Sequence, residues 1–480
     1  MSTDRISTVI LISIDNLRAD CISANPDKSA LADYNLDHYT ETPILDNLVS
    51  KGTFFPNCYS ASSYTTASHA SILTGLYPAQ HGVQEYYRNA ISRDVQTIFD
   101  IFKRAGYVTL LATDFPFLIG PNLGFTRSVE HFIKEDDEQV LKYFNMHQDE
   151  KLFAFVHFGS VHNPFGLSSL KIDGEYFVQQ VAQLGEKMGV PEMFRLEEEW
   201  IEHSRSTRER LMRQRYFRCT DLMYQQCRYN ELMNLYSRGI EYFDRHRFRL
   251  FIEQMVELCK NDSTVLVVTA DHGEEYSKRA FAHYNGLWEG IVNVPLIIIG
   301  PGIPGQKIQQ SICRTVDIVP TLLDLAGINK DKSNFDLDGM SLAPGLYKDP
   351  LSAKGETWFG YTEQIRNFMK LCQKAGKLLQ VRSLANTRLE YMRKDEWKFI
   401  LRSDFSKKQE ESYLFHMKDD RLEKNNLAAQ QPDIVKIMKE EVISGRRQSR
   451  VEEFHVEGEE LEDLALNLKD IGYLKERRIL

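Results

Sequence analysis

The sequence predicts an α/β fold whose central sheet is mainly parallel. Continuous runs of apolar, branched residues at 8–14, 152–158 and 264–269 lack the polar alternation of a half-exposed strand, which indicates strands buried on both faces. Between these runs lie segments with the spacing of amphipathic helices, such as 97–106 with its terminal glycine. Strands that alternate with helices are typical of a parallel sheet covered by helices.

The composition is that of a folded globular protein. The chain has 480 residues, of which 42% are hydrophobic and 26% charged, and this is enough for one large core and a smaller domain. A formal net charge of −9 disfavours a nucleic-acid partner. No apolar run approaches the roughly 20 residues of a membrane span, and the seven cysteines lack metal-binding spacing. We therefore expect a cytoplasmic protein with reduced thiols.

The pattern divides the chain into two parts. Residues 1–345 carry the alternating strands and helices, and a stretch rich in Pro, Gly, Lys and Asp near 345–356 marks a boundary. Residues 346–480 contain paired strand patterns and a charged tail, which predicts a smaller α+β domain. Within the first part, 166–235 is charged, helix-prone and longer than a connection requires. We interpret it as a helical insert that forms a lid or a homo-oligomer contact, with a solvated charged helix as the alternative.

A hydroxyl-rich segment at 59–83 links a strand pattern to a helix pattern. Thr65 and Thr66 precede a run from Ser68 onward that predicts a helix ending at Gly75. The free N–H groups and the positive dipole end of that helix would face an anion bound at either threonine. A surface turn rich in Ser and Thr has the same composition, so the segment alone leaves both interpretations open.

Polar side chains follow three of the predicted strands. Asp15 follows the first strand directly, His162 comes shortly after the second, and Asp271 and His272 follow the third. The carboxyl ends of parallel strands form the edge at which α/β sheets bind ligands, so we expect these side chains to gather there. Asp15 is equally compatible with capping the next helix, and a single histidine such as His162 is more often structural.

The segment at 59–83 resembles the signature of the sulfatase family within the alkaline phosphatase superfamily. That signature contains Cys or Ser, a variable residue, Pro, Ser, Arg and then a helix ending in Leu-Thr-Gly. Counting back from Leu73-Thr74-Gly75 places Thr65 at the residue that sulfatases oxidise to formylglycine, and His69 at the Arg. Threonine would give at best a ketone. A plain Thr nucleophile is instead similar to the phosphoryl-transferring relatives, such as lipoteichoic acid synthases, phosphoethanolamine transferases and nucleotide phosphodiesterases.

The resemblance also implies a metal site. The family has metal-binding acids after its first strand and an Asp-His or Asp-Asn pair after a later one, which correspond here to Asp15 and to Asp271-His272. Asn16 stands at the family's second acid, and Thr65 is implied as a further ligand through its hydroxyl. Carboxylate, amide, hydroxyl and imidazole ligands suit one divalent ion, and their type does not distinguish Mn²⁺, Mg²⁺, Ca²⁺ and Zn²⁺.

The remaining implied site residues would bind an anionic ester. His162 and His283 stand where the family contacts its substrate, and His69 stands at the substrate-binding Arg. The resemblance covers most of the chain outside the insert, and it implies an alkaline-phosphatase/sulfatase-like sandwich. The segment at 418–428 is similar to the signature of the family's small C-terminal sheet and terminal helix.

These residues predict a metal-dependent hydrolase or transferase of phosphate mono- or diesters. A metal lowers the pKa of the Thr65 hydroxyl and orients it, and His162 or His283 would protonate the leaving oxygen. The covalent Thr65 ester would then pass to water or to an acceptor hydroxyl. One alternative is a sulfatase homologue that works without formylglycine. Another is a catalytically silent binding protein with the same fold.

Overall fold

The computed structural model describes the chain in segments, which are residues 6–84, 89–163, 165, 183, 186, 216–217, 219–259, 262–280, 282–283, 286–329, 337–347, 358–363, 387–405, 407–444 and 452–453. Of the predicted insert at 166–235, residues 166–215 lie outside these segments apart from 183 and 186. The tail after 444 also lies outside them, except for 452–453. The lid or oligomer contact expected of the insert therefore stays a prediction.

A nine-stranded sheet forms the centre of the described part of the chain. Its order is β10-β2-β8-β7-β1-β6-β4-β5, and β9 pairs with β2. Among these described strands, β8 alone runs antiparallel to its neighbours. The strands are β1 (Thr8–Ile14), β2 (Thr53–Tyr59), β4 (Val108–Thr113), β5 (His131–Lys134), β6 (Leu152–Phe158), β7 (Thr264–Thr269), β8 (Asn293–Ile299), β9 (Lys307–Ile308) and β10 (Cys313–Arg314).

The three strands predicted from apolar runs lie side by side. β1 pairs in parallel with β6 on one side and with β7 on the other, and all three have the bounds expected from the sequence. Every residue of β6 and β7 is buried, because helices cover both faces of the sheet. The carboxyl ends of β6, β1 and β7 consequently lie together at one edge, and the predicted mainly parallel α/β fold is confirmed.

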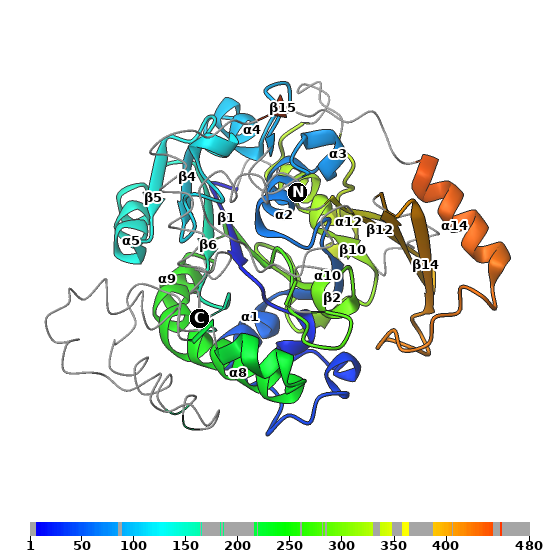
Figure 1. The fold of residues 1–480 in the computed structure, drawn as a ribbon. Coiled ribbons are helices and arrows are strands. Elements are labelled where there is room, and N and C mark those ends of the chain that lie inside the picture. The colour runs from blue at the N-terminus through cyan, green and yellow to red at the C-terminus, as the bar shows by residue number, and fades with distance from the viewer. Residues whose placement is uncertain are drawn as a thin grey trace, which may run out of the picture.

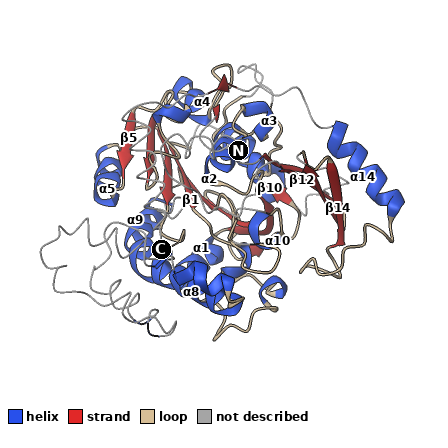
Figure 2. Cartoon of the chain, in the orientation of Figure 1, coloured by secondary structure: helices blue, strands red, loops and turns tan. Residues whose placement is uncertain are grey.

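Helices form layers on both faces of the sheet (Figures 1 and 2). α2, α3 and α4 lie on one side, and α1, α8 and α9 lie on the other. No described helix is both long enough and apolar enough to span a membrane. The helices are α1 (Pro43–Lys51), α2 (Thr65–Thr74), α3 (Pro78–His81), α4 (Ile98–Arg104), α5 (Asp137–Met146), α8 (Tyr229–Phe243), the π-helix η6 (Asp244–Phe248), α9 (Arg249–Cys259), α10 (Glu289–Val292), α11 (Ile318–Leu325) and α12 (Ala343–Tyr347).

A smaller antiparallel sheet follows in the C-terminal part and lies on the right in Figure 1. Its strands are β11 (Trp358–Glu363), β12 (Thr387–Lys394), β13 (Trp397–Asp404) and β14 (Gln409–His416), and α14 (Pro432–Ser444) packs against it through Met438 and Val442. A short ribbon, β3 (Asn89–Ala90) with β15 (Glu452–Glu453), lies elsewhere. The predicted smaller α+β part is therefore present, while residues 348–357 at its expected boundary lie outside the described segments.

Buried polar contacts join the small sheet to the large domain. The ammonium group of Lys398 on β13 lies 3.3 Å from Glu289 on α10 and 2.6 Å from Glu423, and all three side chains are buried. The Tyr391 hydroxyl on β12 donates to the backbone carbonyl of Ser60 at 2.6 Å. Ser60 directly follows β2, so the small sheet supports the start of the loop that leads to Thr65.

Candidate active site

The topology of the sheet brings the predicted metal ligands together. Asp15 directly follows β1 and Asp271 follows β7, and these two strands are parallel neighbours. Because β8 runs in the opposite direction, its amino end lies at the same edge, and the segment with His283 precedes it. The loop with His162 follows β6, the other neighbour of β1. Residues far apart in the sequence therefore meet at one sheet edge.

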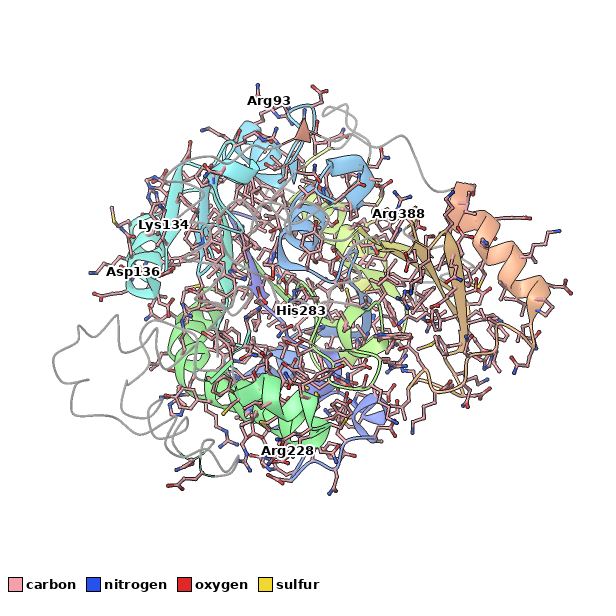
Figure 3. The ribbon with its side chains drawn as sticks, in the orientation of Figure 1. Arg93, Lys134, Asp136, Arg228, His283 and Arg388 are labelled. Carbon is pink, nitrogen blue, oxygen red and sulfur yellow. The ribbon has the colours of Figure 1, made fainter. Side chains whose placement is uncertain are left out.

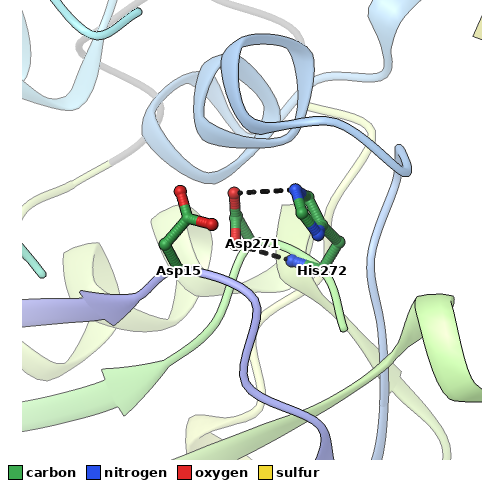
Figure 4. Close-up of side chains that lie close together, drawn as sticks. All are labelled: Asp15, Asp271 and His272. Carbon is green, nitrogen blue, oxygen red and sulfur yellow. Dashed lines mark hydrogen bonds and ion pairs between the residues drawn. The ribbon is translucent and has the colours of Figure 1, made fainter. Parts of the chain in front are cut away.

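Asp15, Asp271 and His272 form a buried cluster beneath α2 (Figure 4). One ligand atom from each lies within 4.8 Å of the others, and all three side chains are fully buried. The carboxylate of Asp271 accepts the backbone N–H groups of His272 at 2.8 Å and of Asn16 at 3.0 Å. These bonds fix one oxygen of Asp271 and leave its other oxygen directed at the cluster.

Two buried oxygen atoms of this cluster, Oδ1 of Asp15 and Oδ2 of Asp271, have no hydrogen-bond partner, and neither has Oδ1 of the adjacent Asn16. A buried oxygen without a partner lowers the stability of the fold unless a hydrogen-bond donor or a cation binds it. Burial and then the nearby charge of Asp271 hold the pKa of Asp15 well above its usual range, so the two carboxylates are difficult to ionise together without a cation. With the His272 imidazole, the donor set fits one divalent metal ion.

Thr65 is the first residue of α2 and faces the cluster of Asp15, Asp271 and His272. Its hydroxyl lies 3.4 Å from Oδ2 of Asp15 and 3.4 Å from Nε2 of His272, and its side chain is buried. The sequence suggested that the helix begins at Ser68, but it begins at Thr65. Tyr64, which has an extended backbone, is its N-cap, and the Tyr64 carbonyl accepts the Ser68 N–H at 3.0 Å. The predicted nucleophile therefore lies within the first helical turn.

Ser68 and His69 attach α2 to the strand ends. The Ser68 hydroxyl donates to the Asp271 carbonyl at 2.6 Å. His69 Nδ1 donates to the Thr65 carbonyl at 2.7 Å, so its Nε2 accepts the Ser13 hydroxyl at 2.9 Å. Both ring nitrogens thus have protein partners, and the ring is fully buried. Substrate binding by His69 stays a prediction, and its contacts favour a role in positioning Thr65 and Asp271.

His162 and His283 lie beside the cluster. The His283 ring centroid is 4.3 Å from that of His272 and 5.6 Å from that of His162. His283 is buried, and its label lies near the centre of the view in Figure 3. Burial, first among the causes, lowers the pKa of each imidazole to about 4. Both rings are therefore neutral near pH 7 and can take part in hydrogen bonding to an anionic substrate.

Two further residues at this edge were not among the predicted site residues. The position of His157 inside a strand pattern predicts a structural role, and in the structure its Nε2 lies 3.2 Å from Oδ2 of Asp15. Glu274, which is 1% exposed, accepts from Nδ2 of Asn16 at 2.5 Å. The available sequence signals were weak: His157 lies inside an apolar strand, and Glu274 is an ordinary acid two residues beyond His272.

The geometry defines a class of α/β protein. In this class a hydroxyl at the start of a helix, here that of Thr65, faces a buried cluster of potential metal ligands at one edge of the sheet. The chain belongs to the sulfatase family, because a family model described as Sulfatase matches residues 7–328. It is similar to an arylsulfatase of Clostridium perfringens (strain 13 / Type A), with 24% identity over 411 residues that cover 75% of this chain and 81% of that enzyme. The resemblance found in the sequence is therefore confirmed, and the protein is a sulfatase-family hydrolase.

Solved structures share the fold at low sequence identity. A protein solved in complex with its substrate D-glucosamine-2-N,6-O-disulfate has a TM-score of 0.65 and 17% identity, and the match covers 92% of this chain and 98% of that one. The phosphonate monoester hydrolase of Agrobacterium radiobacter has a TM-score of 0.60 and 19% identity, with 91% and 95% covered. One fold thus serves both sulfate and phosphonate esters, and it does not choose between them for this chain.

Proposed function

We propose that this protein is a metal-dependent phosphoesterase or phosphotransferase in which Thr65 is the nucleophile. The observation that carries the proposal is the place of the Thr65 hydroxyl, 3.4 Å from both Asp15 and His272 at the start of α2. A threonine at this position cannot become the aldehyde that sulfatases use. Its hydroxyl can attack phosphorus directly once its proton is lost.

The metal ligands would be Asp15, Asn16, Asp271 and His272, with the Thr65 hydroxyl completing the set. A bound divalent cation would lower the pKa of this hydroxyl and neutralise a non-bridging oxygen of the ester. Mn²⁺, Mg²⁺, Ca²⁺ and Zn²⁺ all remain compatible with these donors.

The chain's own groups supply the rest of the chemistry. Thr65 loses its hydroxyl proton to water, and its Oγ1 then forms a bond to phosphorus while the bond to the leaving oxygen breaks. The negative charge of the bound ester raises the pKa of His162 or His283, so that the ring takes a proton from water, passes it to the leaving oxygen and becomes neutral again. The N-terminal N–H groups of α2 stabilise negative charge on the transferred group. Water or an acceptor hydroxyl then attacks phosphorus and releases Thr65, which gives hydrolysis or transfer respectively.

The proposal predicts that Thr65→Ala abolishes turnover while metal stays bound. Removal of a nucleophile commonly costs roughly 10³-fold or more in kcat, and the carboxylates and His272 would still hold the ion. Thr66→Ala is the matched control, because it removes a neighbouring buried hydroxyl that lies at a variable position of the family pattern. Turnover of aryl phosphate mono- and diesters would be measured for both variants, alongside metal content by elemental analysis.

A second measurement looks for the covalent intermediate in enzyme that is quenched during turnover of a phosphate ester. Mass spectrometry of the wild-type enzyme should find the phosphoryl group on the peptide that contains Thr65.

The identity with an arylsulfatase over most of its length favours a sulfatase as the competing function. Faster cleavage of aryl sulfates than of aryl phosphate esters would establish that alternative, and near-normal activity of Thr65→Ala would contradict the assigned nucleophile. Absence of turnover on either ester class would favour the silent binding protein.

A further inference from the structure

Glu274 contacts two groups of the site at once from a buried position. Its Oε2 accepts from Nδ2 of Asn16 at 2.5 Å, and its Oε1 lies 3.4 Å from Nδ1 of His283. The side chain is 1% exposed. Asn16 follows β1, Glu274 follows β7, and His283 precedes α10, so this carboxylate connects three separate segments of the chain.

The backbone around Glu274 is held in place independently of its side chain. Nη1 of Arg18 donates to the Glu274 carbonyl at 2.9 Å, and the preceding Gly273 N–H donates to the Ile291 carbonyl at 2.7 Å. A Cβ atom at Gly273 would lie 2.4 Å from the Gly290 carbonyl oxygen, so this close approach requires glycine. A change confined to the Glu274 carboxylate should therefore leave the local backbone intact.

A carboxylate at this place selects the orientation of the Asn16 amide. The two ends of an amide have nearly the same shape, so their hydrogen bonds decide which way they point. Oε2 of Glu274 lies 2.5 Å from Nδ2 of Asn16 and accepts from it, so the nitrogen is the end of the amide that faces this side chain. This leaves Oδ1 of Asn16, which is buried without a hydrogen-bond partner, as the atom available to a cation. The reverse orientation would present an N–H group to the metal site.

The same carboxylate selects the tautomer of His283. Nδ1 of His283 faces Oε1 of Glu274 at 3.4 Å. A proton on Nδ1 points toward that oxygen, whereas the other tautomer sets two lone pairs against each other, so the Nδ1–H form is favoured and Nε2 is left for proton exchange. We propose that Glu274 is a positioning residue that orients the Asn16 oxygen toward the metal and fixes the His283 tautomer. The inference rests on the proposed function only for the role of His283; the orientation of Asn16 concerns metal binding alone.

Glu274→Leu tests the Asn16 part and Glu274→Gln the His283 part. Leucine accepts from neither group, whereas glutamine keeps one oxygen that can accept from Asn16 and presents an N–H to His283. Glu275→Gln is the matched control: Glu275 is the adjacent buried acid, and its Oε1 binds Nε of Arg279 at 2.8 Å, outside the cluster. Unchanged thermal denaturation would confirm that the variants fold.

Titration of the metal-free enzymes with Mn²⁺ alone measures the effect on Asn16. Loss of an outer partner of a metal ligand commonly weakens binding roughly 10–100-fold, so we expect that range for Glu274→Leu and near wild-type affinity for Glu275→Gln. Adding Asn16→Asp to Glu274→Leu should restore affinity, because a carboxylate offers an oxygen in either orientation. Wild-type Mn²⁺ affinity in Glu274→Leu, or no recovery in the double variant, would overturn the metal part of the proposal.

The effect on His283 is measured by how kcat/KM depends on the basicity of the leaving group. Aryl phosphodiesters with increasingly basic phenols should lose progressively more kcat/KM in Glu274→Gln, because poor leaving groups need protonation more. A loss that is uniform across the series would contradict the His283 part. If wild-type enzyme cleaves no phosphate ester, the proposed function fails, whereas the Mn²⁺ titration still decides whether Glu274 orients Asn16.

Discussion

Asp271 is the residue on which most contacts of the site converge. It accepts two backbone N–H groups, its Oδ2 lies 3.6 Å from Nδ1 of His69, and its carbonyl accepts the Ser68 hydroxyl. The neighbouring imidazoles of His272 and His69, with the N–H of Asn16, overcome the effect of burial and lower its pKa. Asp271 is therefore the ligand that is already ionised and oriented before a cation binds.

Asp271→Asn should remove bound divalent metal together with activity. The substitution preserves shape and volume but deletes the charge that offsets the cost of burying a divalent cation. Elemental analysis of the purified variant measures the result. Asp100→Asn is the control, because Asp100 belongs to the capping box of α4 and not to the site. Full metal occupancy in Asp271→Asn would place the metal site elsewhere.

At the scale of elements, the junction of α2 and α3 contains a buried histidine. His81 is the last residue of α3, and its Nδ1 accepts the Val83 N–H at 3.2 Å, so its Nε2 donates to the Ser71 hydroxyl on α2 at 3.0 Å. Burial lowers the pKa of His81 to about 3. The ring is therefore neutral in the folded protein, and it holds α3 against the helix that carries Thr65.

This histidine predicts acid sensitivity. An unfolded histidine gains a proton as the pH falls below about 6.5, while folded His81 does not, so the stability that it contributes is present above that pH and is lost progressively as the pH falls toward 3. His81→Gln should reduce the slope of unfolding free energy against pH by roughly 1 kcal/mol per unit between pH 5 and 6. Urea denaturation at constant metal concentration measures this. Equal slopes of variant and wild type in that interval would contradict it, whereas equal slopes above pH 7.5 are expected.

Elements differ in how far the sequence predicted them. The bounds of β1, β6 and β7 follow from uninterrupted apolar runs, and the strand-end positions of Asp15 and Asp271 follow from those bounds. The start of α2 at Thr65 could not be predicted from the sequence. Thr65 and Thr66 are β-branched and form helices weakly in isolation, so tertiary contacts determine where the helix begins. The role of Glu274 was also unpredictable, since its contacts depend on how three distant segments meet.

At the scale of the whole molecule, a buried charge cluster joins the small sheet to the large domain. Lys398 lies between Glu289 and Glu423, and Arg279 lies 3.3 Å from Glu423. The Tyr59 hydroxyl at the end of β2 donates to Glu289 at 2.7 Å. The small sheet is thus attached to the strand that leads into the nucleophile loop, which explains how a part remote from Thr65 contributes to the order of the site.

Lys398→Met should destabilise the junction of the two sheets. Removing one partner of a buried ion pair leaves uncompensated charge, so the free energy of unfolding should fall by roughly 3 kcal/mol. Lys407→Met is the control, because Lys407 forms an exposed pair with Asp404 at 3.9 Å and such pairs contribute less than about 1 kcal/mol. Adding Glu423→Gln to Lys398→Met should recover part of the loss, since it removes one of the unpaired charges. Equal urea midpoints for Lys398→Met and Lys407→Met would show that the junction does not depend on this ammonium group.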